Sequence, residues 1–287
     1  MKTVQTIAEV RRIVSEARAA GRTVGFAPTM GGLHDGHLSL IDAAGRACDF
    51  VVVSIFLNPT QFAPGEDLST YPRSIESDLS ACEACGADLV FVPDVETMYP
   101  GNALVTVAVS GLTETLCGRS RPTHFAGVCT VVAKLFNIVL PDKAFFGQKD
   151  FQQLAIITRM VADLDIPVEI VSCPIVREPD GLAMSTRNQR LGDSERSQAI
   201  ALHGALVLAN EQIRQFNPPA VEVIASAREH IRANAPDGEV DYIQIIDPLT
   251  LLDVETTDRP VLVALAVKFP GARLIDNMLV DSAADSQ

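Results

Sequence analysis

Apolar residues in the first half of the chain form short, nearly continuous runs, and the segments between these runs repeat with helical periodicity. The runs predict strands at 23–27, 50–56, 88–92, 144–146 and 168–171. They lack the alternation of a half-solvated strand, so we expect burial on both faces and a parallel sheet. The helical patterns lie at 38–47, 75–85, 128–139 and 151–164. This order predicts an α/β fold with a doubly wound, Rossmann-like parallel sheet.

The pattern changes near residue 175. Helical stretches at 194–216 and 219–233 meet at Asn217-Pro218-Pro219, and strand-like runs follow at 240–246, 261–269 and 273–278. We therefore expect a doubly wound domain over 1–175 and a smaller C-terminal α+β domain over 176–287. The last residues, 282–287, are expected to be frayed.

Composition and charge narrow the classes of function. Hydrophobic residues make up 47% of the 287 residues, which is enough for a substantial core. The net charge of −13 argues against a nucleic-acid partner, because such a partner needs a basic face. No apolar run is long enough to span a membrane. The N-terminus shows a capping box at Thr6 and Glu9 in place of a secretory pattern. We expect a cytoplasmic protein without a membrane partner.

The six cysteines are expected to be reduced and chemically inert. Only Cys82 and Cys85 form a C-x-x-C pair, and no second pair or nearby histidine completes a zinc site. The pair lies late in a helical pattern, not at a helix start, where a reactive thiolate would be stabilised.

The most informative segment is the turn after the first predicted strand. It contains Gly31, Gly32, His34 and His37, and a predicted helix follows it. Such a turn offers backbone N–H groups and the positive end of a helix dipole to a phosphate. Two imidazoles can also hydrogen-bond the charge that develops on a phosphate in a transition state. Two surface histidines, or half of a metal site, remain the alternatives.

Two amides, Asn58 and Gln61, follow the second predicted strand. Amides can hold a hydroxyl, a carboxylate or an amine by direction rather than by charge. A turn started by Asn58-Pro59 is the plainer explanation.

The segment 145–153 again reads as a strand, a glycine turn and a helix. A lysine at a helix start opposes the helix dipole, so Lys149 indicates a bound phosphate. Asp150 is either an N-cap or an acceptor for ribose hydroxyls. Gln153 lies about one turn further on the same side.

A polar loop near the expected domain boundary contains Ser185, Thr186 and Arg187. Arg187 can contact two phosphate oxygens at once, and such a loop can close over a ligand. An ordinary turn between domains is the alternative.

The remaining titratable residues are less informative. Arg121 and His124 add a cation and an imidazole, whereas His203 and His230 fit helical patterns as packing or surface residues. Asp78 could contact a hydrated magnesium ion, but a solvated helix face explains it equally well.

In combination, these stretches resemble the pantothenate synthetase (pantoate–β-alanine ligase) family of the nucleotidylyltransferase superfamily, with its His-x-Gly-His turn. The likeness covers most of the first two-thirds of the chain, and the joint order of the motifs is specific. The matching segments are 28–37, 58–62, 71–73, 121–125, 146–153 and 184–188, with looser matches at 241–242 and 274–277.

The resemblance implies a two-step reaction. Pantoate attacks the α-phosphate of Mg-ATP to give pantoyl adenylate and pyrophosphate, and β-alanine then attacks the acyl carbon to give pantothenate and AMP. ATP is thus a substrate used with Mg²⁺, no tightly bound organic cofactor is expected, and the family implies a homodimer. The alternatives are an adenylyltransferase that acts on another small substrate and a catalytically silent nucleotide-binding module.

The resemblance also implies residue roles. The expected catalytic residues are His37, which acts as the acid, His34, Lys149 and Arg187. Pantoate is expected to contact Asn58, Gln61, Arg121, His124 and Gln153, with Gln61 also near β-alanine and Asp78 as the candidate metal contact. The smaller domain is expected to close over the site. The expected ATP-binding residues are Met30, Gly31, Gly32, Leu33, His34, Asp35, Gly36, His37, Gly147, Gln148, Lys149, Asp150, Val176, Met184, Ser185, Thr186 and Arg187.

Three of these positions depart from the family pattern. Gln148 stands where Glu is common, Thr186 stands where Ser is common, and Gly32 replaces a frequent Ala, which is a small change in a turn. Gln148 and Thr186 keep a side chain that can form hydrogen bonds, so we expect ATP binding and catalysis to be retained.

Overall fold

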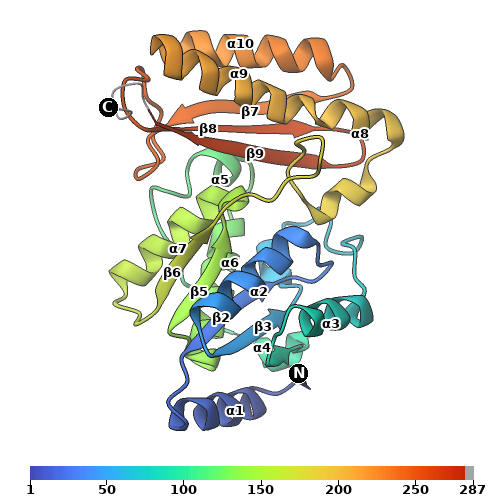
Figure 1. Cartoon of the computed structure of the whole chain (residues 1–287), viewed down its shortest axis with the longest axis vertical. Coiled ribbons are helices and arrows are strands. Elements are labelled where there is room, and N and C mark those ends of the chain that lie inside the picture. Colours follow the sequence, from blue (N-terminus) through green and yellow to red (C-terminus); the bar gives the residue numbers. More distant parts are fainter. Residues whose placement is uncertain (102, 282–287) are drawn as a thin grey trace. The chain divides into compact units, whose positions relative to one another are not determined.

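The computed structural model describes residues 1–101 and 103–281, which form two compact units (Figure 1). The first unit comprises Met1–Gln148 and Ile156–Ile175. The second comprises Lys149–Ala155 and the chain from Val176 onward. The short segment Lys149–Ala155 therefore groups with the second unit, although it falls inside the range expected for the first domain. The expected fraying at 282–287 concerns residues outside the described ranges.

The described part of the first unit contains a six-stranded parallel sheet with the strand order β1-β4-β3-β2-β5-β6. The predicted doubly wound sheet is confirmed, and β3 is buried at every residue. Strand β1 is absent from the predicted elements, because only one of its three residues is buried and so short a run carries no periodicity. The strands are β1 (Lys2–Val4), β2 (Val24–Thr29), β3 (Phe50–Ile55), β4 (Leu89–Phe91), β5 (Lys143–Gly147) and β6 (Glu169–Cys173).

Helices cover both faces of this sheet. Residues that are neighbours along a strand point to opposite faces, and Phe26 of β2 stacks edge-on against Phe136 of α6, whereas Ala27 joins Ile41 of α2 in a separate apolar cluster. The helical elements are α1 (Ile7–Ala19), α2 (Asp35–Ala47), η1 (Pro59–Gln61), α3 (Ile75–Ala84), α4 (Val95–Met98), α5 (Leu116–Ser120), α6 (His124–Val139), η2 (Gln148–Asp150) and α7 (Phe151–Asp163). The predicted capping box opens α1, where Glu9 N donates to Thr6 Oγ1 at 3.3 Å.

The strand order places the candidate segments of the first unit at one edge of the sheet. Strand β2 lies between β3 and β5, so the strand order reverses there. Ligands of open α/β sheets bind beyond the carboxyl ends of the strands at such a switch point. The turn 30–37 follows β2, the amides at 58–61 follow β3, and Gln148 follows β5.

The second unit is the expected α+β arrangement. Its described residues contain a three-stranded antiparallel sheet with the order β7-β8-β9. The apolar cluster of this unit joins α9 and α10 to the sheet, as shown by Leu206, Ile231 and Val263. The helical stretch predicted at 194–216 is divided at Ile200 into two helices. The elements are η3 (Thr186–Arg190), α8 (Asp193–Ala199), α9 (Ala201–Phe216), α10 (Ala220–Asn234), β7 (Glu239–Ile246), β8 (Val261–Lys268) and β9 (Arg273–Val280).

Within the described ranges, no helix has both the length and the apolar character needed to cross a membrane.

Helix α6 touches η1 at Gly127. A Cβ atom at this position would lie 2.3 Å from the carbonyl oxygen of Thr60 and 2.7 Å from the Cα of Gln61. Because both neighbours are backbone atoms, they cannot move aside as a flexible side chain could. Glycine at 127 therefore lets the helix support the segment that carries the two amides.

We expect Gly127→Ala to lower the free energy of unfolding by about 1–3 kcal/mol, because the added methyl group overpacks this contact. Thermal unfolding followed by circular dichroism measures the change. The matched control is Gly45→Ala in α2, where the nearest atom would lie 4.0 Å from the new Cβ and helix propensity favours alanine. Equal stability of the two variants would contradict the close packing of α6 on η1.

Candidate functional site

The turn after β2 depends on two left-handed glycines. Gly31 has a φ of 89° and Gly32 a φ of 65°, and side-chain-bearing residues rarely adopt such values. Space is also restricted, because a Cβ atom on Gly31 would lie 3.0 Å from Asp78 Oδ2. This conformation turns the chain from β2 directly into α2.

Asp78 of α3 holds this turn in place. Its Oδ2 accepts the N–H of Gly32 at 2.9 Å, and its Oδ1 accepts the N–H of Leu33 at 2.8 Å. The side chain is buried, so the solvated helix face considered for Asp78 is wrong. Its contact to a magnesium ion stays a prediction.

The two histidines of the turn have defined tautomers. His34 is the N-cap of α2 and accepts the N–H of Gly36 at Nδ1, at 3.1 Å. His37 accepts the N–H of His34 at Nδ1, at 3.3 Å, and the ring centroids lie 4.1 Å apart. Because both Nδ1 atoms accept hydrogen bonds, the neutral rings carry their protons on Nε2. The turn therefore holds two N–H donors of the kind that binds phosphate oxygens.

Among the residues that the structure describes, no metal-binding cluster accompanies these histidines. Across residues 1–101 and 103–281, no three His, Cys, Asp or Glu residues gather closely enough to hold a metal ion. Nucleotide-bound Mg²⁺ usually takes one or two carboxylates together with phosphate oxygens and waters. A single carboxylate beside the turn fits that donor set, and a protein-only site does not.

Asn58 and Gln61 form one buried hydrogen-bonded unit. The two N–H groups of the Asn58 amide donate to Gln61 Oε1 and to the carbonyl oxygen of Gly127, each at 3.2 Å. The Asn58 Oδ1 accepts the hydroxyls of Thr60 and Tyr99, each at 2.9 Å. The plain Asn-Pro turn is present as η1, but the Asn58 amide is fully used within the protein, with one N–H orienting Gln61. A direct contact from Asn58 to a ligand would require one of these bonds to exchange.

Arg121 and His124 act on the backbone of Gln61. His124 Nδ1 donates to the Gln61 carbonyl oxygen at 2.7 Å, and Arg121 Nη2 donates to the same oxygen at 3.3 Å. Arg121 also makes a two-pronged ion pair with Glu66, at 2.6 and 2.5 Å. Contacts from Arg121 and His124 to pantoate stay predictions, whereas their contact with Gln61 is present.

Glu66 is held in its charged form. Burial would raise the pKa of this carboxyl, but the hydrogen bonds and charge of Arg121 outweigh burial and hold the pKa below its ordinary value. The carboxylate is thus the form that completes the network around Gln61.

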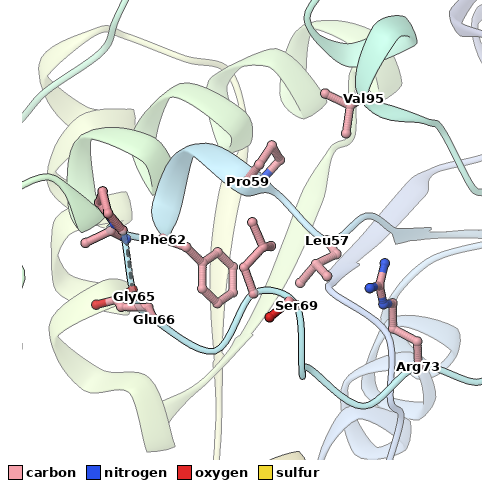
Figure 2. A pocket seen from close by; sticks show the side chains of 11 residues that line it. Leu57, Pro59, Phe62, Gly65, Glu66, Ser69, Arg73 and Val95 are labelled. Atoms are coloured by element: carbon pink, nitrogen blue, oxygen red, sulfur yellow. Dashed lines mark hydrogen bonds between the residues drawn. The ribbon is translucent and has the colours of Figure 1, made fainter.

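A cavity of about 630 Å³ lies beside this network. The ring of Phe62 and the side chain of Leu57 line it, and Arg73 stands at one side (Figure 2). Glu66 also lines it, so the cavity shares the 62–66 segment with the network. The site residues predicted from the sequence are not among its lining residues.

Lys149 and its neighbours belong to the second unit. The carbonyl oxygen of Lys149 accepts the Nδ2–H of Asn277 at 2.9 Å. Lys149 Nζ lies 4.0 Å from Asp150 Oδ1, and Asp150 is exposed, while Gln153 is half-buried.

A hairpin over 176–184 precedes Arg187 in the same unit. Met184 N donates to the carbonyl oxygen of Val176 at 3.0 Å, which closes the hairpin. Ser185 caps η3 by accepting the N–H of Arg187 at 3.3 Å, and Thr186 is buried. The structure thus brings His34 and His37 together in the first unit, and it collects Lys149 and the 184–187 segment in the second.

The thiols of the C-x-x-C pair, Cys82 and Cys85, are unreactive as nucleophiles. Burial, followed by the charge of Asp78, raises the pKa of Cys82 to about 12, and burial also raises the pKa of Cys85. Both groups therefore stay protonated at neutral pH, as expected for inert thiols.

Sequence reasoning missed several residues that arrange the site. Tyr99 and Gly127 contact the amide unit, and Glu66 pairs with Arg121 beside it. Asp276 and Asn277 contact the segments of the second unit. None of these carries a local pattern that distinguishes it from an ordinary loop, helix or strand residue. Looser family matches at 274–277 were the one available signal.

Glu66→Gln is expected to lower the free energy of unfolding by about 1–2 kcal/mol at pH 7, because Arg121 loses a charged acceptor. The pKa of Glu66 is lowered on folding, so the stabilisation is present above the pKa of the unfolded chain and is lost as pH falls through the folded value. The difference from the unaltered protein should therefore shrink below about pH 4.5. Circular dichroism during urea denaturation suits a chain without tryptophan. The control is Glu76→Gln, at an exposed position of α3. If the loss of unfolding free energy in Glu66→Gln stayed the same at acidic pH, or equalled that of the control, this account would be contradicted.

Asp78→Asn is expected to destabilise the protein by about 1–3 kcal/mol, because an NH2 donor replaces one of the two oxygens that accept the backbone N–H groups of the turn. The control is Asp35→Asn, an exposed carboxyl at the start of α2. Thermal unfolding compares the two variants. If Asp78→Asn were no less stable than Asp35→Asn, the carboxylate would not be holding the turn.

Comparison with known proteins connects this arrangement to one family. The model of the family described as pantoate-beta-alanine ligase matches residues 2–279. A curated relative from Acetivibrio thermocellus, named pantothenate synthetase, is 48% identical over 98% of this chain and 100% of its own length. Another of that name, from Fervidobacterium nodosum, is 50% identical over 98% of this chain and 100% of its own length.

Solved structures show the same likeness. Pantothenate synthetase from Thermus thermophilus aligns with a TM-score of 0.92 and 46% identity, covering 97% of this chain and 99% of its own. Pantoate-beta-alanine ligase from Francisella tularensis, solved with beta-gamma ATP and beta-alanine, aligns with a TM-score of 0.81 and 32% identity over 97% of both chains. The resemblance inferred from the motifs is confirmed: the chain belongs to the pantoate–β-alanine ligase family.

Proposed function

We propose that this chain condenses pantoate with β-alanine to give pantothenate at the expense of ATP, with pantoyl adenylate as the intermediate and pyrophosphate and AMP as products. The observation that carries the proposal is the turn after β2. It presents two Nε2–H donors at the switch point of the sheet, where such folds bind their ligands. The membership of the family specifies the substrates.

In the first step, a carboxylate oxygen of pantoate attacks the α-phosphorus of ATP, and the bond from that phosphorus to the bridging oxygen breaks. Pyrophosphate leaves with the electron pair. Negative charge builds up on the phosphate oxygens in the transition state. This charge is stabilised by the Nε2–H groups of His37 and His34, together with Lys149 and Arg187. His37 also acts as the acid. No side-chain nucleophile is required, because positioning and charge stabilisation are sufficient.

In the second step, the amine of β-alanine attacks the acyl carbon of the adenylate. The carbon–oxygen bond to AMP breaks, AMP leaves with the electron pair, and the amine loses a proton. Gln61 holds pantoate and lies near β-alanine in this proposal. Its fixed backbone and oriented amide suit it to direct two partners in turn.

The remaining residues are assigned to ATP and pantoate. Asp150 accepts ribose hydroxyls, the backbone of Val176 contacts adenine, and Gln153 contacts pantoate. Asn58, Arg121 and His124 serve the pantoate site, and their hydrogen bonds to Gln61 support that role. The turn 30–37, the segment 147–150 and the segment 184–187 are assigned to the nucleotide.

We propose that Mg²⁺ enters with ATP, held mainly by phosphate oxygens and waters, and supplies charge neutralisation at the phosphates. Asp78 is the candidate protein contact beside the turn. Because both of its oxygens already accept backbone N–H groups, that contact would use their remaining lone pairs.

A homodimer is proposed as the assembly. Support comes from the segment 103–109, which contains no helix or strand and in which Leu104 is 94% and Val105 is 77% exposed. Exposed apolar residues that adjoin one another are typical of protein contacts. The cytoplasmic location stays a prediction.

His37→Ala is expected to slow pantoate-dependent release of pyrophosphate by about 100-fold or more in a single turnover, because it removes one donor to the developing charge. His230→Ala in α10 is the control and should react at the normal rate. A near-normal rate for His37→Ala would refute the role of that residue.

The same assay distinguishes the alternative functions. The ligase releases pyrophosphate when pantoate is added and AMP only when β-alanine follows. Pyrophosphate release without any AMP would indicate an adenylyltransferase, and ATP binding without turnover would indicate a silent module. Either result would overturn the proposed ligase reaction.

A further inference from the structure

Strand β9 carries two adjacent polar residues that reach two different segments of the second unit. Successive side chains of a strand point to opposite faces. Asp276 is bound by Arg177, at the base of the 176–184 hairpin, and Asn277 is bound to Lys149. Because β9 is an edge strand of its sheet, both segments can lie against it without displacing a neighbouring strand.

Asp276 fixes the base of the hairpin. Arg177 donates to Asp276 Oδ2 through Nη1 at 2.6 Å and to Oδ1 through Nη2 at 3.0 Å. The Asp276 side chain is only 1% exposed. Arg177 Nη1 also donates to the carbonyl oxygen of Gly181 at 3.0 Å, so one guanidinium ties the tip of the hairpin to its base.

The tip itself is braced by α9. Gly181 has a φ of 96°, and a Cβ atom there would lie 2.3 Å from His203 Nδ1. The chain continues from this hairpin into η3, which packs on β9. The hairpin therefore contacts β9 through Arg177, and the η3 segment that contains Arg187 contacts the same strand.

Asn277 fixes the backbone of Lys149. Its Nδ2 donates to the Lys149 carbonyl oxygen at 2.9 Å, and its backbone N–H donates to Asp276 Oδ1 at 2.8 Å. The same carboxylate that holds Arg177 thus also orients Asn277. The dipeptide Asp276-Asn277 therefore holds both the Arg177 side chain and the Lys149 backbone.

The energetics of this arrangement favour a positioning role over a purely stabilising one. Burying an ion pair costs desolvation, and well-packed apolar residues often give equal or greater stability. The unit contains a second ion pair of similar kind, in which Arg273 binds Asp241 at 2.7 Å. That pair joins β9 to β7, and Asp241 also pairs with Lys268 of β8 at 2.6 Å.

We propose that Asp276 and Asn277 are positioning residues for adenylate formation, which set the places of Arg187 and Lys149 through the hairpin base and the Lys149 backbone. The inference rests on the proposed function, in which both cations contact the triphosphate. Small misplacements of groups that act on a transition state reduce rates by up to about 100-fold.

The first experiment compares Asp276→Asn with Asp241→Asn. Both changes remove a carboxylate that is paired with arginine on the same sheet, so Asp241→Asn controls for the loss of such a pair. We expect Asp276→Asn to lower kcat for pantoate-dependent pyrophosphate release at least about tenfold, with little change in KM for β-alanine. Asp241→Asn should keep normal kcat, and Asp276→Glu should recover part of the loss. Equal activities of the two Asn variants would overturn the proposal.

The second experiment is a double-mutant cycle on Asn277 and Lys149, and it holds even if Asp276→Asn fails to fold. Asn277→Ala should slow pyrophosphate release in the unaltered protein and have no further effect in Lys149→Ala, because it acts through that lysine. Equal slowing in both backgrounds would overturn the inference while leaving the function of Lys149 intact. A normal rate in Lys149→Ala would instead refute the phosphate role of Lys149 in the proposed function, and the inference with it.

Discussion

The hydrogen bonds from Gly32 and Leu33 to Asp78 are the interaction on which the site of the first unit depends. Two glycines with positive φ can adopt many conformations, and a turn built from them is not rigid by itself. The buried carboxylate selects one of these conformations. Only then does His34 reach the N-cap position of α2, and only then does its neighbour ring take its place beside it.

The same principle applies at Gln61 and Lys149. Hydrogen bonds fix the backbone of each residue, while its side chain is the part expected to contact the ligand. The Gln61 carbonyl is held by His124 and Arg121, and the Lys149 carbonyl is held by Asn277. Fixing the main chain lowers the entropy that a flexible side chain must lose when it orders on a ligand. Accuracy in such a site therefore comes from residues that need not touch a substrate.

Sequence reasoning succeeded where the determining pattern is local. The continuous apolar run of β3 predicts a strand in a parallel sheet, and the closely spaced glycines and histidines predict the turn between β2 and α2. It failed where the determining contact joins distant positions. Asp78 and Gly32 are 46 residues apart, Arg177 and Asp276 are 99 apart, and Lys149 and Asn277 are 128 apart. A solvated helix face for Asp78 was a reasonable interpretation of its helical spacing, yet it is wrong because the spacing does not show what lies above the helix.

The division of the chain at Lys149–Ala155 has a consequence for how this family can change. The first residues of α7 group with one unit and the remaining residues with the other, so the two units are interleaved along the gene. A chimera that exchanges only the segment after Ile175 between two relatives would separate a Lys149 backbone from the strand that evolved to hold it. Recombination that preserves both units must carry the short segment Lys149–Ala155 together with the chain from Val176 onward.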